Sequence, residues 1–158
     1  MMLKENRLTL ICSHFYPTSE EVVINQIKYQ ILDTGGQEVA RKLWKNYLEQ
    51  VNAIVFVVDA CDRSRFDTAK YELEKVLAME ELKNIPFVIF GNKIDSPYAV
   101  NEEEFKACLG LDKFNDIGQG DSFEKKRPVK VFMCSVFLRF GFLEGFNLLS
   151  QFFFRRIL

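Results

Sequence analysis

The chain is short of histidine, of net charge and of long apolar runs, and each shortage excludes a class of protein. Its single histidine, His14, excludes any site that needs two. The 21 basic and 22 acidic side chains nearly cancel, which disfavours a general nucleic-acid binder. No run approaches about 18 apolar residues, and the first ten residues carry charge, so neither a membrane-spanning nor a secreted protein is expected. We therefore expect an intracellular chain.

Cysteine patterning and chain length narrow the class further. No two cysteines have CxxC spacing, and three of the four adjoin apolar residues, which favours reduced, packed thiols over disulfides or zinc ligands. The four are Cys12, Cys61, Cys108 and Cys134. At 158 residues and 48% apolar composition, the chain has the size of one domain with one core. We expect a single domain over residues 1–158.

Short apolar runs alternate with longer amphipathic stretches, which is typical of an α/β domain with a mostly parallel sheet. Residues Val51–Asp59 are nearly all β-branched or aromatic, which predicts a strand buried on both faces. Pro86–Gly91 and Val129–Cys134 predict further strands of this kind. Glu21–Ile27 and Lys28–Asp33 predict an antiparallel hairpin at one edge, which makes the sheet mixed.

The remaining periodic stretches predict helices. Apolar residues recur at helical spacing in Ser64–Leu82, and helices are also expected over Asn101–Cys108 and Gly141–Phe154. Asn101 precedes three glutamates, a pattern typical of a helix N-cap with acidic residues in the first turn. Residues Asp112–Arg127 contain two glycines and a basic triplet, so we expect an exposed loop there.

Two polar segments follow predicted strands, at the sheet edge where α/β proteins bind their ligands. Residues 33–37 read Asp-Thr-Gly-Gly-Gln, which combines a carboxylate, two glycines that permit close backbone approach, and an amide that can orient water. Residues 92–95 read Asn-Lys-Ile-Asp. The carboxylate of Asp95 can accept two parallel hydrogen bonds from the N1 and N2 donors of guanine, and the stem of Lys93 can cover the base. Each segment alone is weak evidence, but the two in this order are specific.

These segments, followed by Cys134-Ser135-Val136, resemble the guanine-nucleotide-binding domain of Ras-superfamily small GTPases. More closely, the chain is similar to the Sar family, which starts COPII coat assembly and is related to the ADP-ribosylation factors. The similar stretches are Pro17–Glu21, Ala40–Lys42, Trp44–Leu48, Gly91–Asp95 and Val131–Val136. The resemblance runs from about Met2 to Gln151.

The resemblance implies a three-layer P-loop GTPase-like (Ras-like) α/β fold and a family activity of GTP binding and hydrolysis. It implies GTP or GDP and Mg²⁺ as ligands, and COPII coat subunits and an exchange factor as partners. It places the protein in ER-to-Golgi vesicle transport, in the cytoplasm at the cytosolic face of the endoplasmic reticulum and Golgi. A nucleic-acid partner is not implied.

The resemblance also implies site residues. Asp33 would hold Mg²⁺ through water, Gly36 would offer its amide to the γ-phosphate, and Gln37 would orient the attacking water. Sar proteins usually carry histidine at the position of Gln37, whereas ADP-ribosylation factors carry glutamine, and either side chain can orient water. Asp95 would select guanine. The remaining base-site residues would be Asn92, which braces the loop, Lys93, which covers the base, and Ser135, Val136 and Phe137.

The sequence departs from the family at its beginning. None of its eight glycines precedes Gly35, so the phosphate-binding motif G-x-x-x-x-G-K-[ST] is absent from these residues. By resemblance we expect a shortened domain without the first strand, the phosphate loop and the amphipathic membrane helix. His14 stands at the position of the switch threonine, and imidazole is a poor partner for Mg²⁺. Residues Leu8–Cys12 are apolar and are expected to fill the vacant strand position, unless the chain is a fragment that folds poorly alone.

Two functions stay open from the sequence. The first is a Sar-like GTPase, and the second is a nucleotide-binding-deficient pseudo-GTPase or fragment that acts as a protein-interaction module. Whether the chain is an enzyme is undecided at this point. Membrane contact is expected to be weakened, although the tail Phe152–Leu158 combines aromatic rings with two cations that suit either a packed final helix or an anionic membrane surface.

Overall fold

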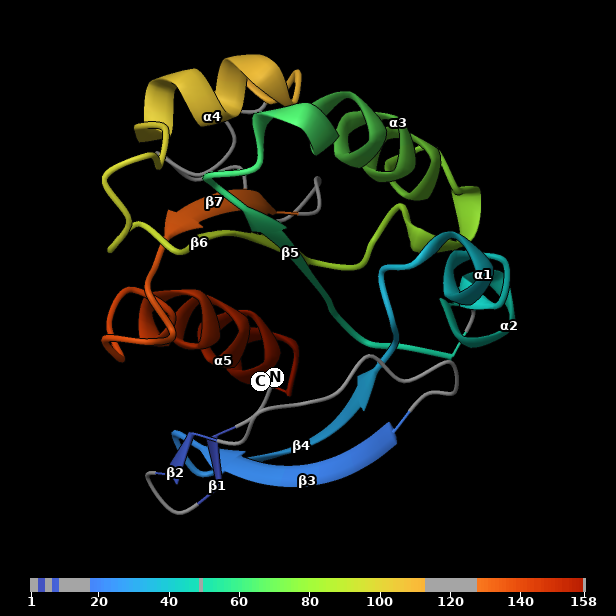
Figure 1. The fold of residues 1–158 in the computed structure, drawn as a ribbon. Coiled ribbons are helices and arrows are strands. Elements are labelled where there is room, and N and C mark those ends of the chain that lie inside the picture. Colours follow the sequence, from blue (N-terminus) through green and yellow to red (C-terminus); the bar gives the residue numbers. More distant parts are fainter. Residues whose placement is uncertain (1–2, 5–6, 9–17, 49, 113–127, 158) are drawn as a thin grey trace. The chain divides into compact units, whose positions relative to one another are not determined.

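The computed structural model describes residues 3–4, 7–8, 18–48, 50–112 and 128–157, which divide between two compact units, Met1–Val51 and Asn52–Leu158 (Figure 1). The first unit carries an antiparallel hairpin, and the second carries a parallel sheet with helices on both faces. The chain thus has the expected α/β fold. Among the described helices, none is both long and apolar enough to cross a membrane.

The first unit is built on antiparallel pairing. Its elements are β1 (Leu3–Lys4), β2 (Arg7–Leu8), β3 (Thr18–Ile24), β4 (Ile27–Asp33), α1 (Glu38–Arg41) and α2 (Trp44–Leu48). Strands β3 and β4 pair from Thr18 opposite Asp33 to Ile24 opposite Ile27. Asn25 and Gln26 form the two-residue turn with φ of 51° and 64°, the left-handed pair that suits the strand twist of a tight hairpin. The predicted hairpin is confirmed, with strand ends that differ from those expected. It forms a two-stranded sheet of its own, so the expectation that it lies at one edge of a mixed sheet is not met among the described strands.

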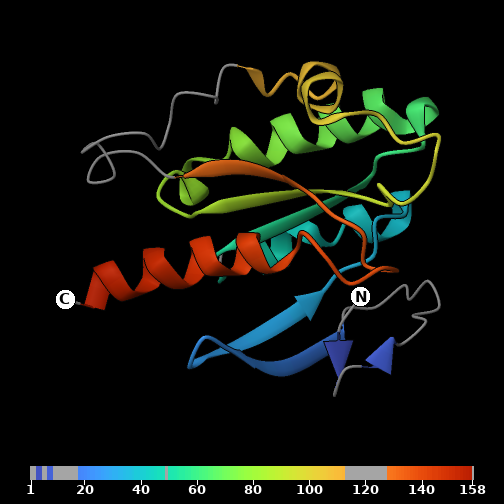
Figure 2. The ribbon, with the colours of Figure 1, turned by 90° about the vertical axis from the view of Figure 1, so that its left-hand side faces the viewer.

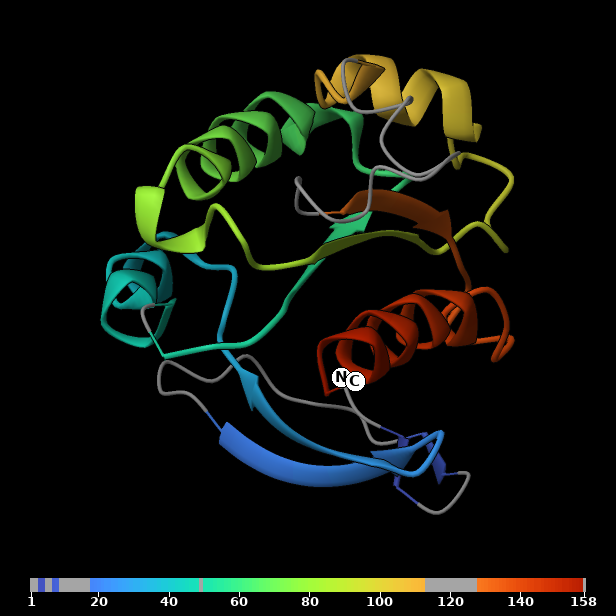
Figure 3. The ribbon, with the colours of Figure 1, turned by 180° about the vertical axis from the view of Figure 1, so that it is seen from behind.

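The second unit has three layers. Its elements are β5 (Ile54–Asp59), a 3₁₀ turn (Arg63–Arg65), α3 (Phe66–Leu77), a second 3₁₀ turn (Glu80–Leu82), β6 (Phe87–Asn92), α4 (Glu102–Cys108), β7 (Val129–Met133) and α5 (Leu143–Ile157). The strands are parallel in the order β5-β6-β7. Helices α3 and α4 cover one face and α5 covers the other, as the front and rear views show (Figures 1 and 3).

Strand β6 is the centre of the second unit. Phe87, Val88 and Ile89 have no exposed surface, because β6 has a strand on each side and helices on both faces. Side chains alternate between these faces: a Cβ on Gly91 would lie 3.2 Å from the Phe105 ring of α4, whereas Gly145 of α5 lies against Val88 and Phe90. Figure 2 shows α5 running along the sheet.

The predicted helices are present with shifted ends. The helix expected over Ser64–Leu82 is α3 flanked by the two 3₁₀ turns, and its residues Phe66, Leu73 and Val76 are buried as the apolar periodicity predicts. Asn101 is the N-cap of α4, because its side-chain Oδ1 accepts a hydrogen bond of 2.9 Å from the backbone N–H of Glu104. Capping satisfies one donor that the first turn of the helix leaves without a partner.

The prediction that the strand in Val51–Asp59 is buried on both faces is wrong. Val55 and Val57 of β5 are 39% and 58% exposed. They pair in register with Val88 and Phe90 and so share the face on which α5 lies. The principal contacts of α5 are with β6 and β7. Full burial therefore belongs to β6 rather than to β5. The same expectation for Val129–Cys134 is also wrong, because in β7 only Val129 is buried and the other residues are half-buried.

Several expectations fall outside the described residues. They include the strand expected over Leu8–Cys12 beyond Leu8, the position of His14, and the loop over Asp112–Arg127 beyond Asp112. Of the four cysteines, Cys61, Cys108 and Cys134 are described, and all three are free thiols, as expected.

Substitution of Gly145 by alanine tests the close approach of α5 to β6. Alanine favours a helix over glycine by about 1 kcal/mol, yet the added Cβ would lie 2.6 Å from the Phe90 ring. The centroid of the Phe90 ring lies 6.3 Å from that of Phe132 and 6.2 Å from that of Phe146, so the ring has little room to shift. We expect Gly145→Ala to lower the free energy of unfolding by about 1–3 kcal/mol in urea titration. The matched change Gln151→Ala, at an exposed position of the same helix, is expected to change it by less than about 0.5 kcal/mol.

Candidate functional site

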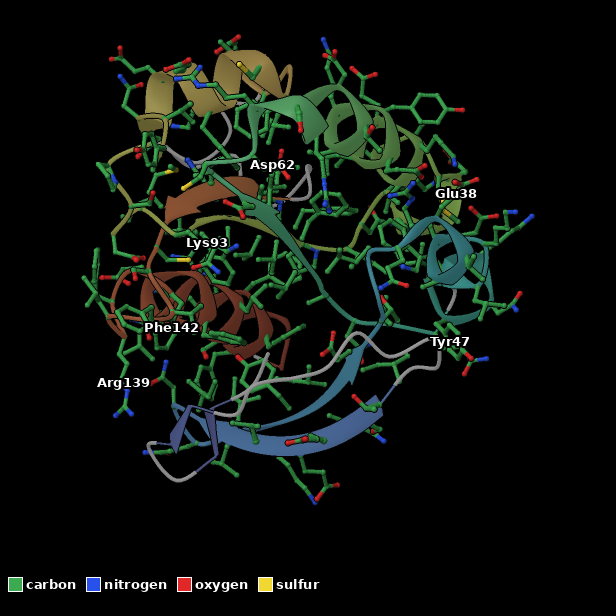
Figure 4. All side chains as sticks on the ribbon, viewed as in Figure 1. Glu38, Tyr47, Asp62, Lys93, Arg139 and Phe142 are labelled. Atoms are coloured by element: carbon green, nitrogen blue, oxygen red, sulfur yellow. The ribbon has the colours of Figure 1, made fainter. Side chains whose placement is uncertain are left out.

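Polar side chains gather where the three parallel strands of the second unit end. Asp59 ends β5 and Asn92 ends β6, opposite one another in register, and Ser135 follows β7 by two residues. Figure 4 shows Lys93, the residue after β6, at this end of the sheet. Two backbone bonds join the loops: the Cys134 N–H donates to the Gly91 carbonyl at 2.8 Å and the Ile94 N–H to the Cys134 carbonyl at 3.3 Å.

Asn92 ties the end of β6 to the loop after β7. Its Oδ1 accepts a hydrogen bond of 3.1 Å from the Val136 N–H and lies 3.8 Å from the Cys134 Sγ. The same loop is closed by Ser135 and Phe140, whose backbone groups exchange two hydrogen bonds of 3.0 Å. The backbone at Val136 is therefore held by its bond to Asn92 and by the paired backbone groups of Ser135 and Phe140. Burial raises the pKa of the Cys134 thiol to about 11, so this cysteine stays protonated and acts as a packing residue.

Asp95 is oriented by Ser135. The Ser135 hydroxyl, which is fully buried, donates to Oδ1 of Asp95 at 2.5 Å and accepts from the Leu138 N–H at 3.0 Å. The Asp95 side chain is exposed. A carboxylate can accept about four hydrogen bonds, so the bond from Ser135 orients Asp95 and leaves its other acceptor positions open to a ligand. The arrangement presents a fixed carboxylate that can accept from two neighbouring donors of a ligand.

Lys93 is held at both its backbone and its side chain. Its φ is 72°, a left-handed conformation that is uncommon outside glycine, at the start of a turn closed by the Ser96 N–H on the Lys93 carbonyl at 3.0 Å. Its Nζ lies 2.6 Å from Oδ2 of Asp59, whose Oδ1 accepts from the Cys61 N–H at 2.9 Å. The Cys61 Sγ lies 3.4 Å from the Lys93 carbonyl oxygen.

The ion pair sets the ionisation of Asp59. Partial burial acts to raise the pKa of this carboxyl, but the hydrogen bond and charge of Lys93, together with the Cys61 N–H, outweigh it and leave the pKa below its ordinary value. In return, the hydrogen bond from Asp59 raises the pKa of Lys93. The sequence analysis did not single out Asp59, although the signal used for Asp33, a carboxylate at the end of a predicted strand, could have identified it.

The other two residues expected after β7 differ in exposure. Val136 is half-buried, whereas the Phe137 side chain is 72% exposed. The structure thus joins Asp95 to Ser135 and Asn92 to Val136 by separate hydrogen bonds, pairs Lys93 with Asp59, and leaves the ring of Phe137 at the surface.

The other polar segment, residues 33–37, lies in the first unit. Asp33 ends β4, and Gln37 directly precedes α1 and is exposed. The glycine carbonyls between them are hydrogen-bonded by side chains that the sequence analysis did not single out. Arg41 Nη1 donates to the Gly36 carbonyl at 2.9 Å, and Trp44 Nε1 donates to the Gly35 carbonyl at 3.1 Å. A Cβ on Gly36 would meet nothing within 4 Å, so packing within the structure does not demand glycine there.

The donor set limits the kind of metal site. Within the described part of the chain, no group of three or more His, Cys, Asp or Glu side chains could enclose a metal ion. Mg²⁺ commonly keeps several waters and takes only one or two carboxylates together with substrate phosphates. A single carboxylate at the end of β4 is consistent with such a site and inconsistent with a site built from protein ligands alone.

The family comparison and the comparisons with individual proteins agree on one family. Residues 1–153 match the ADP-ribosylation factor family. The chain is 37% identical over 152 residues to the small COPII coat GTPase SAR1 of Giardia intestinalis, and 34% identical over 158 residues to that of Nicotiana tabacum. Each alignment covers 96% of this chain and 80% of the relative. ADP-ribosylation factor K of Dictyostelium discoideum is 36% identical over 81% of this chain and 63% of its own length.

A solved structure supports the fold. The Arl6 (BBS3) small GTPase from Trypanosoma brucei, determined with the bound nucleotide analogue GppNp, superposes with a TM-score of 0.77 at 24% identity. The superposition covers 92% of this chain and 83% of that one. At this level of identity the likeness concerns the fold.

The pairing of Asp59 with Lys93 predicts a pH signature. A folded-state pKa below the ordinary value of about 3.9 means that the pair stabilises the fold above that pH and that this contribution is lost as the pH falls through the folded pKa. In an NMR titration we expect Lys93→Met to raise the pKa of Asp59, because burial is then opposed only by the backbone N–H and the side chain of Cys61. Lys75→Met, which removes an exposed pair with Glu72, is the control and should leave that pKa in place. An unchanged Asp59 pKa in Lys93→Met would contradict the pairing.

Proposed function

The chain belongs to the ADP-ribosylation factor family of small GTPases, and from this membership we propose that it binds guanine nucleotides through the ends of β6 and β7 in its second unit. The observation that carries the proposal is the hydrogen bond from Ser135 to Asp95, next to the one that Asn92 accepts from the Val136 N–H. It presents an oriented carboxylate beside a loop whose backbone is already fixed.

The chemistry of this group suits guanine over adenine. Guanine presents two adjacent donors, N1–H and the 2-amino group, which match the two oxygens of Asp95, whereas adenine has no such pair of donors. The bond from Ser135 restrains rotation of the carboxylate, so less side-chain entropy is lost when a base binds. The stem of Lys93 would cover one face of the base, and Val136 and Phe137 would complete the pocket.

We assign the phosphate-related roles to the first unit by family membership. Asp33 would hold Mg²⁺ through water, the Gly36 N–H would donate to the γ-phosphate, and Gln37 would orient the water that attacks it. Bound Mg²⁺ supplies charge neutralisation for the phosphates in this family of reactions. The hydrogen bonds of Arg41 and Trp44 to the glycine carbonyls support these roles, because they hold the backbone of this segment.

Within the family we place the chain on the Sar branch. Both SAR1 relatives align over 80% of their length, and the alignment with ADP-ribosylation factor K covers 63% of that protein. We therefore propose a role in COPII coat recruitment during ER-to-Golgi transport, at the cytosolic face of the endoplasmic reticulum, with coat subunits and an exchange factor as partners.

Equilibrium binding of fluorescent GDP, with Mg²⁺ present, tests the base site. We expect Asp95→Asn to weaken binding by about 10- to 200-fold, because it replaces one of two acceptors by a donor. The same change should favour xanthosine diphosphate, whose C2 oxygen accepts the new amide N–H while N1–H still donates to the amide oxygen. This exchange of preference is the control for folding, since a misfolded variant would bind neither nucleotide.

A chain that binds no guanine nucleotide at about 1 mM would contradict the proposal. That result would favour the alternative function, an interaction module that has lost nucleotide binding. The observation that supports this alternative is that residues 1–158 contain no glycine-rich phosphate motif.

Retention of purified COPII coat subunits by the immobilised chain tests the branch assignment. We expect the GTP-loaded chain to retain coat subunits, and the GDP-loaded chain to retain several-fold less. A parallel assay with an ADP-ribosylation factor coat serves as the comparison. Equal retention of both coats, or a preference for the ADP-ribosylation factor coat, would contradict the Sar assignment. Neither result would contradict the proposed guanine-nucleotide binding.

A further inference from the structure

Asp59 and Lys93 form a charged pair where β5 and β6 end. Asp59 and Lys93 lie at the ends of neighbouring strands, where Asp59 is paired in register with Asn92, the residue before Lys93. Their side-chain atoms Oδ2 and Nζ are 2.6 Å apart. The Ala60 N–H also donates to the Asn92 carbonyl at 2.9 Å, so the backbones of the two segments are held together.

Both oxygens of Asp59 already have defined partners. Oδ1 accepts from the Cys61 N–H at 2.9 Å and Oδ2 from Lys93. The first bond fixes the carboxylate to its own turn, which leaves the second oxygen to act on Lys93 from a fixed position. Asp59 therefore behaves as an anchor whose own orientation does not depend on Lys93.

A free lysine side chain is a poor cover for a base. Its four-carbon stem samples many rotamers, and fixing them costs conformational entropy. In Lys93 one end of the stem is set by the turn that begins at this residue, and the other by Asp59. The stem is thus ordered at both ends before any ligand arrives, which lowers the entropic cost of binding.

We infer that Asp59 is a positioning residue of the proposed base site: by holding the ammonium of Lys93, it keeps the Lys93 stem ordered. The inference rests on the proposed guanine-nucleotide function. Asp59 does not touch the base. Its effect on affinity passes entirely through Lys93, which distinguishes it from a residue that merely supports the fold.

A double-mutant cycle separates these two roles. Asp59→Asn keeps an oxygen that can accept from the Cys61 N–H but removes the charge that holds Lys93. Lys93→Met keeps an unbranched apolar stem but removes the ammonium. The single variants, the double variant and the native chain are compared by equilibrium binding of fluorescent GDP with Mg²⁺, and thermal unfolding of each confirms that it is folded.

The expected result is non-additive. Asp59→Asn should weaken GDP binding by about 2- to 5-fold in the native background, the range of a partly exposed ion pair, and should have no further effect in the Lys93→Met background. Equal weakening in both backgrounds would show that Asp59 acts through its turn and would overturn the inference. An unchanged affinity in Asp59→Asn would overturn it as well.

Failure of the proposed function gives a different pattern. If the native chain binds no GDP and Asp95→Asn binds no xanthosine diphosphate, the base site itself is refuted, and the positioning role falls with it. If native binding depends on Asp95 but is indifferent to Asp59, only the positioning role is refuted. The two failures are therefore distinguishable within one set of titrations.

Discussion

Parallel pairing of β6 with a strand on each side is the constraint on which the second unit depends. A strand with neighbours on both edges and helices on both faces cannot leave a backbone group unpaired without a large cost, so its register is strongly specified. Phe87, Val88 and Ile89 are wholly buried as a result. Because β5, β6 and β7 are parallel, their carboxyl ends lie on the same side of the sheet. The polar residues at or just after these ends, Asp59, Asn92 and Ser135, are therefore close together.

The two carboxylates at this edge are held in different ways, and the difference matches their proposed uses. Asp59 is partly buried and paired with a cation, so its charge is neutralised inside the protein. Asp95 is exposed and held by the neutral hydroxyl of Ser135, so its charge is not cancelled by that partner. A pairing cation on Asp95 would compete with ligand donors, whereas a hydroxyl orients the carboxylate at little electrostatic cost.

Local sequence signals predicted most of the fold, and they failed where burial depends on distant elements. The hairpin of β3 and β4, the strands β6 and β7, and the cap at Asn101 follow from alternation, apolar runs and capping chemistry that a few adjacent residues carry. The apolar run in β5 predicted burial on both faces, yet Val55 and Val57 are exposed. A strand's own residues do not reveal where a later helix packs, and α5 packs mainly against β6 and β7.

The α/β class, the order of the polar segments along the chain and the candidate residues in them could be predicted from the sequence, because they depend on residue type and periodicity. The tertiary structure decided which side chains act on those residues. Arg41 and Trp44 reach the glycine carbonyls from five and nine residues away in the same stretch of chain. Ser135 on Asp95 and Asp59 on Lys93 are bonds between separate segments. Such bonds follow from strand order, register and loop geometry, which bring together residues that no local pattern associates.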